Sequence, residues 1–200
     1  MTRLASTLFL ITALAIGCSP GGHLAIHSVT DRDTLLEGGF DSSIYRLDDR
    51  GNLTILLLDG PLENPAQAVT IRMLWAPRTA RTPLDPGATN ASIRYVIFTG
   101  ENNGRVGVYS GAGYFYPTGR PGQSRITGEI WEASLRLIDG NDGFSDLLGP
   151  SQLSGHISAL RNDGAMNEAL NRLDILVTKR LGYPQYVWVD TGRLVDRIQQ

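Results

Sequence analysis

Hydrophobic and polar residues alternate along much of the chain, and this two-residue period is typical of half-buried β-strands. The clearest case is the segment 67–75, "QAVTIRMLW", where alternation puts Val69, Ile71, Met73 and Trp75 on one face. Six further segments have strand-like composition between turn-forming residues: 42–47, 53–58, 91–99, 105–117, 125–139 and 153–161. Their short or medium connections predict antiparallel neighbours rather than a wound parallel sheet.

One later segment has helical periodicity instead. Asp163 can act as the N-cap, Gly182 can take the left-handed conformation that ends a helix, and Pro184 prevents its continuation, so we expect a helix over about 164–181. Its apolar face consists of Met166, Ala169, Leu170, Leu173, Leu176 and Val177. The following residues 185–190, "QYVWVD", are expected to form a final short strand.

These elements predict a mainly β fold. The expected architecture is an antiparallel meander that forms a barrel or a two-layer sandwich, with one C-terminal helix and a final short strand. We expect one β-rich domain over 40–200, preceded by a tether and turn-rich lead-in over 18–39. The segment 76–90 is rich in proline and lacks an apolar period, so it is expected to be a long surface loop.

The first residues differ from the rest of the chain. Arg3 gives a positive start, residues 4–16 are uncharged and largely apolar, and Gly17 is a small residue at the expected cleavage point. This order is typical of a secretory signal peptide, and the apolar run is too short to span a bilayer. Residues 1–17 are therefore predicted to be a signal peptide.

The segment Leu14 to Cys18, "LAIGC", resembles the lipobox of bacterial lipoprotein precursors. The resemblance implies that Cys18 becomes the mature N-terminus and carries lipid, which would anchor the protein to a membrane of the bacterial cell envelope. Ser19 resembles the pattern of outer-membrane lipoproteins, with a periplasmic or a surface face, if the organism has two membranes. A general signal-peptidase site and a lone buried thiol are the alternative interpretations of Cys18.

Charge and cysteine content narrow the possible partners. The formal net charge of the whole chain is −2, so the sequence shows no basic footprint for nucleic acid. Cys18 is the sole cysteine, which leaves neither disulfides nor thiolate metal sites to the mature chain.

Candidate chemistry is sparse. His156 is the one histidine of the predicted domain, and no G-x-S-x-G motif accompanies it, so we predict no catalytic site. The acidic segment 139–146 does not match a calcium loop, and His23 and His27 lie in the expected tether, so no metal site and no cofactor are predicted. Glu129 and Glu132 are expected to point to opposite faces of their strand because their separation is odd.

Aromatic residues concentrate on two neighbouring predicted strands. Tyr109, Tyr114, Tyr116 and Trp131 are candidates for a ligand or partner surface, since large aromatics with a polar tip favour binding surfaces. The alternative is that they fill an ordinary β core.

The order of elements resembles the lipocalins in outline, which implies a barrel with an enclosed apolar ligand; at the place of their G-x-W motif the chain has Gly39-Phe40-Asp41. We favour a non-enzymatic envelope lipoprotein whose β domain binds an envelope protein, a cell-wall polymer or an apolar ligand. The alternatives are a lipocalin-like carrier and an envelope hydrolase that uses His156 with carboxylates.

Overall fold

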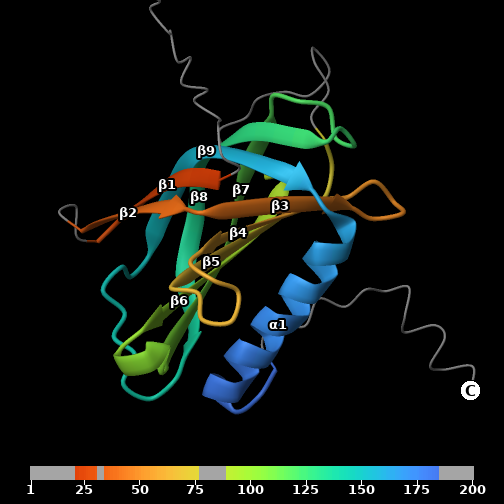
Figure 1. Cartoon of the computed structure of the whole chain (residues 1–200). Coiled ribbons are helices and arrows are strands. Elements are labelled where there is room, and N and C mark those ends of the chain that lie inside the picture. Colours follow the sequence, from red (N-terminus) through yellow and green to blue (C-terminus); the bar gives the residue numbers. More distant parts are fainter. Residues whose placement is uncertain (1–20, 31–33, 77–88, 185–200) are drawn as a thin grey trace, which may run out of the picture.

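The structure is a computed structural model that describes residues 21–30, 34–76 and 89–184, and within them it forms one nine-stranded sheet and one long helix (Figure 1). The strands are β1 (Gly21–Ser28), β2 (Leu35–Phe40), β3 (Ser42–Leu47), β4 (Leu53–Asp59), β5 (Gln67–Met73), β6 (Ala91–Thr99), β7 (Arg105–Pro117), β8 (Arg125–Gly140) and β9 (Ser151–Arg161). The helices are the short 3₁₀ turn η1 (Glu101–Asn103) and α1 (Asp163–Leu181). The predicted mainly β class, the meander and the C-terminal helix are confirmed, whereas residues 185–190 lie outside the described residues.

The seven predicted strands correspond to β3 through β9, and each pairs antiparallel with the next one in the chain. The last of them, β9, also pairs with the first, β3, through a short parallel contact of Ile44 with Leu160 and of Tyr45 with Arg161. The pairings from β3 to β9 therefore form a closed ring. This parallel contact is the one departure, among the described strands, from the expected antiparallel neighbours.

The sheet begins earlier than the sequence predicts. Residues 18–39 were expected to be a tether and lead-in, yet β1 pairs with β9 along eight residues and β2 pairs with β1. Leu24 and Ile26 of β1 and Phe40 of β2 are buried in the core, so these two strands belong to the folded body. Their alternation is short and interrupted by glycines, which weakens the strand pattern in the sequence.

The interior of the sheet is filled by side chains. Its largest fully buried members are Tyr45, Tyr95, Tyr109 and Phe115, surrounded by aliphatic side chains from neighbouring strands. The hydroxyl of Tyr95 donates to Oε1 of Gln67 at 2.6 Å and that of Tyr109 donates to Oδ1 of Asp146 at 2.6 Å. Since buried polar groups are costly without partners, these bonds allow tyrosine to pack inside the sheet.

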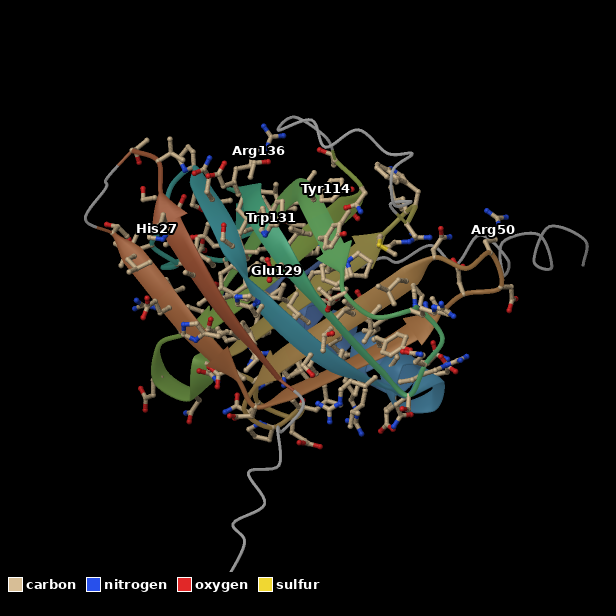
Figure 2. All side chains as sticks on the ribbon, turned by 90° about the horizontal axis from the view of Figure 1, so that it is seen from above. His27, Arg50, Tyr114, Glu129, Trp131 and Arg136 are labelled. Atoms are coloured by element: carbon tan, nitrogen blue, oxygen red, sulfur yellow. The ribbon has the colours of Figure 1, made fainter. Side chains whose placement is uncertain are left out.

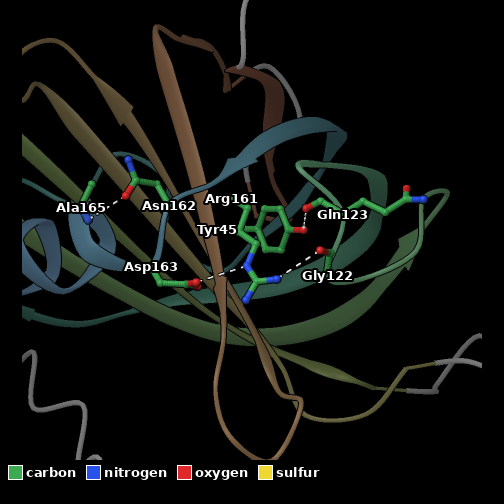
Figure 3. Close-up of polar contacts among 7 residues, drawn as sticks. All are labelled: Tyr45, Gly122, Gln123, Arg161, Asn162, Asp163 and Ala165. Atoms are coloured by element: carbon green, nitrogen blue, oxygen red, sulfur yellow. Dashed lines mark hydrogen bonds and ion pairs between the residues drawn. The ribbon is translucent and has the colours of Figure 1, made fainter.

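A set of polar contacts ties β3, β9 and the start of the helix together (Figure 3). The Tyr45 hydroxyl donates to the carbonyl of Gln123, and Nη1 of Arg161 donates to the carbonyl of Gly122 at 3.1 Å. Nε of Arg161 lies 3.2 Å from Oδ2 of Asp163, which forms an ion pair. These contacts hold one end of the ring closed beside the parallel β3–β9 contact.

The helix begins one residue earlier than predicted. Asn162, not Asp163, is the N-cap, because its Oδ1 accepts a hydrogen bond from the backbone N–H of Ala165 at 3.0 Å (Figure 3). Gly182 takes the left-handed C-cap conformation, as predicted, with its N–H donating to the carbonyl of Thr178 at 2.8 Å.

The apolar face of α1 covers the outer face of the middle strands (Figure 1). The buried cluster between them consists of Leu56, Leu58, Ala68, Val96, Phe98, Val106 and Val108 from the strands and Met166, Ala169, Leu170, Leu173 and Val177 from the helix. The guanidinium of Arg180 lies 4.9 Å above the Phe98 ring and fixes the far end of the helix. Among the described helices, none has the length and apolar character needed to cross a membrane.

Candidate functional site

Aromatic side chains gather on the outer face of β7 and β8, on the part of the sheet that α1 does not cover (Figure 2). Tyr114 pairs across the strands with Trp131, and Tyr116 pairs with Glu129. The rings of Tyr116 and Trp131 are nearly parallel, with an interplanar angle of 9° and centroids 6.2 Å apart. Trp131 is 51% exposed, so the pair presents aromatic surface to solvent.

A β-bulge places Trp131 and Glu132 next to each other on the solvent side of β8. The register between β8 and β9 shifts between Ile130 and Ala133, and Glu132 has a positive φ of 45°. Trp131 and Glu132 are both exposed between the buried Ile130 and Ala133. The expectation that Glu129 and Glu132 point to opposite faces is therefore wrong, because the bulge adds one residue on the solvent side.

Trp75 joins this aromatic surface from a distant part of the sequence. Alternation predicted that it would share the face of Val69 and Met73, but β5 ends at Met73 and Trp75 lies beyond it, exposed. Its ring contacts Tyr114 edge to face, with centroids 6.1 Å apart. Once the strand has ended, the two-residue period no longer determines the direction of the side chain.

Tyr114 is the buried member of the aromatic surface. Its hydroxyl is buried and has no hydrogen-bond partner among the described residues. Burial, with a smaller effect of Tyr116, raises the pKa of Tyr114 above its ordinary value. We define Trp75, Tyr114, Tyr116 and Trp131 as the aromatic patch.

A row of polar side chains crosses the sheet beside the aromatic patch. In register, Tyr116 of β7 lies opposite Glu129 of β8, Glu129 lies opposite His156 of β9, and His156 lies opposite His23 of β1. Directly opposed residues point to the same face, so these four side chains form one line on the outer surface. We call it the polar row.

Glu129 connects the polar row to the aromatic patch. Its Oε1 lies 3.3 Å from Nδ1 of His156, and its Oε2 accepts a hydrogen bond from the indole Nε1–H of Trp131 at 2.9 Å. Both contacts are at the surface, where an ion pair contributes at most about 1 kcal/mol to stability. They fix the directions of the histidine and indole rings more than they stabilise the fold.

Three members of the polar row, His23, Glu129 and His156, line an open hollow of about 640 Å³. His23, Asp41, Thr118, Thr127, Glu129, His156 and Ser158 contribute its polar lining. Gly155, next to His156, has a φ of +153°, and a Cβ there would lie 2.1 Å from the carbonyl oxygen of His23. Glycine is therefore required at this position for β1 to lie against β9 and to complete the hollow.

Tyr109 does not belong to this surface. It is 1% exposed and lies inside the sheet, so its prediction as a surface residue is wrong. The other three candidates lie at the surface site: Tyr116 and Trp131 are exposed, and Tyr114 lies between them and Trp75. Burial raises the pKa of Tyr109 above its ordinary value, and the hydrogen bond to Asp146 adds to the effect.

Asp146, from the acidic segment 139–146, also accepts hydrogen bonds from the backbone N–H groups of Leu148 and Gly149. Its carboxylate thus orders the loop that closes this end of the sheet.

Two predicted features fall largely outside the described residues. Cys18, the predicted lipidation site, is one of them, and residues 77–88 of the predicted 76–90 loop are the other. Asn90, at the end of that segment, is buried and bonds to Phe115 in both directions, each at 2.8 Å. It is an anchor for β7 rather than part of a surface loop.

The arrangement suits recognition better than acid–base chemistry. The His156 side chain is 79% exposed, so solvent surrounds the imidazole beside Glu129. Enzymes usually exclude water from the groups on which charge develops during a reaction, and an imidazole this exposed does not allow that. Stacked aromatics beside donors and acceptors are instead the elements with which proteins hold a ligand.

Comparisons with models of protein families, with curated proteins and with solved structures find no match to this chain. A function for this site is therefore inferred from the geometry of the site itself.

Proposed function

We propose that the protein is a lipid-anchored lipoprotein of the bacterial cell envelope whose β domain binds an envelope component without transforming it. The observation that carries the binding role is the exposed, ordered pair of Tyr116 and Trp131 beside Glu129. Exposed apolar groups held in fixed positions are typical of interaction sites. The lipobox-like segment that ends at Cys18 supports the anchor.

The anchor is tested with Cys18→Ser, with cell fractionation as the measurement. We expect the variant to leave the membrane fraction or to accumulate as an uncleaved precursor, because acyl chains hold such a protein on the bilayer. We also expect the mass of the lipid on Cys18 to appear in the intact mass of the mature wild-type protein. A processed variant that stays in the membrane fraction would contradict the anchor.

The binding role is tested by sedimentation with isolated cell envelopes, using purified protein that begins at Ser19 and therefore carries no acyl chains, because acyl chains would by themselves hold every variant on the envelopes. We expect this lipid-free wild type to co-sediment and its Trp131→Ala variant to remain in the supernatant. Ile175→Ala is the matched control, since Ile175 is an exposed apolar residue on α1 and far from the aromatic patch in the fold. Equal sedimentation of wild type and Trp131→Ala would contradict binding through this face.

The contact of His156 with Glu129 favours a second candidate, an envelope hydrolase with His156 as general base. It predicts that incubation with isolated envelopes releases soluble fragments and that His156→Ala abolishes the release. The binding proposal predicts no release above that of His156→Ala. The filled interior speaks against the third candidate, the lipocalin-like carrier, since tyrosine and phenylalanine occupy the space that its apolar ligand would need.

A further inference from the structure

We infer that the aromatic patch and the polar row together form a binding site for an uncharged oligosaccharide chain. This inference rests on the proposed binding function and adds the class of ligand. It follows from the shape of the hollow, from the chemistry of its lining and from the position of the aromatic pair at its edge.

The shape favours a chain over a compact ligand. The polar row runs across four neighbouring strands, from β7 to β1. Strands lie about 4.8 Å apart, so the row extends over about 14 Å. An open hollow along such a row accepts a ligand whose ends continue into solvent, as those of a polymer do, whereas compact ligands are usually enclosed.

The lining excludes two other classes of ligand. Within the described residues, neither lysine nor arginine lines the hollow, while Asp41 and Glu129 do, and the nearby guanidinium of Arg125 donates to the hydroxyl of Ser158 at 3.0 Å. The carboxylates of the lining therefore disfavour phosphates and other polyanions. Phe40 and Ile157 are the large apolar residues of the lining, and both are buried in the core of the sheet. An acyl chain would therefore meet no exposed large apolar side chain in the hollow.

The remaining groups match the chemistry of sugars. A pyranose ring has an apolar face of C–H groups and a rim of hydroxyls that both donate and accept hydrogen bonds. The ring faces of Tyr116 and Trp131 can contact the apolar C–H face of the sugar. The sugar hydroxyls can form hydrogen bonds with side chains of the lining, namely the hydroxyls of Thr118, Thr127 and Ser158 and the carboxylate of Glu129.

Glu129 has a particular place in this site. It accepts the indole N–H of Trp131 and lines the hollow at once, so it orients the stacking ring relative to the groups that meet the hydroxyls. We assign Trp131 the stacking contact and Glu129 the positioning of that contact. His156, on the other side of Glu129, continues the polar surface toward His23.

The test is isothermal titration of the purified full-length protein, as the cell processes it, in a detergent without a sugar headgroup. The probes are chitohexaose, cellohexaose and mannohexaose, with hexametaphosphate as the anionic control. We expect at least one of the neutral hexasaccharides to bind with millimolar affinity or better, and hexametaphosphate not to bind. Binding of hexametaphosphate alone, or of none of the probes, would overturn the inference.

Variants locate the binding. We expect Trp131→Ala to weaken it at least tenfold, Trp131→Phe to weaken it less because a ring remains, and Ile175→Ala to leave it unchanged. Glu129→Gln can still accept the indole N–H, so it is expected to retain more affinity than Glu129→Ala. Saccharide binding that is insensitive to Trp131→Ala would contradict this site.

The two proposals can fail separately. If the wild type co-sediments with envelopes through Trp131 but binds no hexasaccharide, the binding function stands and the ligand class assigned here is wrong. If neither occurs, both are wrong.

Discussion

The outer surface of the sheet has two parts with different side chains: a covered face beneath α1 and a bare face over β8, β9 and the end of β7. Beneath α1 the strands present aliphatic residues, and the helix buries them completely. Over β8, β9 and the end of β7 they present aromatic and polar residues, which no described element covers. Strand β7 belongs to both, because Val106 and Val108 lie under the helix whereas Tyr114 and Tyr116 belong to the aromatic patch.

The difference separates stability from recognition. Aliphatic side chains that a helix covers contribute free energy of folding, since about 25 cal/mol is gained for each Å² of apolar surface removed from water. Aromatic rings that remain at the surface contribute little to folding, but their contact area stays available to a ligand. The faces can thus be altered independently.

The largest expected effect comes from the covered face. Leu173 is fully buried between α1 and the sheet, so Leu173→Ala removes its packing and leaves a cavity. We expect the free energy of unfolding to fall by about 2–5 kcal/mol, measured by urea denaturation. Ile175→Ala, two positions along the same helix and exposed, should change it by less than about 0.5 kcal/mol. Equal losses in the two variants would mean that the helix does not pack through the Leu173 face.

The second-largest expected effect is a pH dependence of folding stability, which comes from tyrosines in the interior of the sheet beneath both faces. Burial raises the pKa values of Tyr95 and Tyr109 above the ordinary value. In the unfolded chain these hydroxyls lose their protons near pH 10, whereas in the folded protein they keep them to higher pH, so the unfolded state binds fewer protons in that range. Stability should therefore be unaffected by these groups below about pH 9 and should fall as the pH rises beyond about 10.

Urea denaturation at pH 8 and pH 11 measures this loss. Tyr109→Phe should be less stable than the wild type at pH 8, since the bond to Asp146 is lost, but its further loss between the two pH values should be smaller. The same loss in both proteins would show that the Tyr109 hydroxyl does not titrate differently in the two states.

The smallest effect on folding is expected from the bare face. Trp131→Ala removes a half-exposed ring and its stacking on Tyr116, so we expect the free energy of unfolding to change by less than about 1 kcal/mol. Thermal and urea denaturation check this value. A loss comparable to that of Leu173→Ala would show that the aromatic patch is part of the core and would remove the separation between the two faces.

Much of the fold follows from local patterns. Alternation predicts β3 through β9, and the apolar period with Gly182 predicts α1, because both signals depend on residues close together in the sequence. The strands β1 and β2 could not be predicted in this way, since β1 pairs with β9, more than 100 residues further on, and β2 joins the sheet through β1.

The candidate site was only partly predictable for the same reason. Composition indicates Tyr116 and Trp131, but the contact of Glu129 with His156 and the place of His23 beside them depend on register between distant strands. The bulge at Trp131 and the end of β5 before Trp75 also break the period on which the prediction relies. Tyr109 shows the converse, because an aromatic with a polar tip can be satisfied inside the sheet by Asp146.

The most direct test of the central claim, that the bare face binds while the covered face only stabilises, is a ¹H–¹⁵N NMR titration with the hexasaccharide that binds best. We predict that the indole N–H signal of Trp131 and the backbone amides of Tyr116, Glu129 and His156 shift with ligand concentration, while those of Leu173 and Val177 do not. Shifts centred on α1, or a Trp131 indole signal that does not move at saturation, would contradict it.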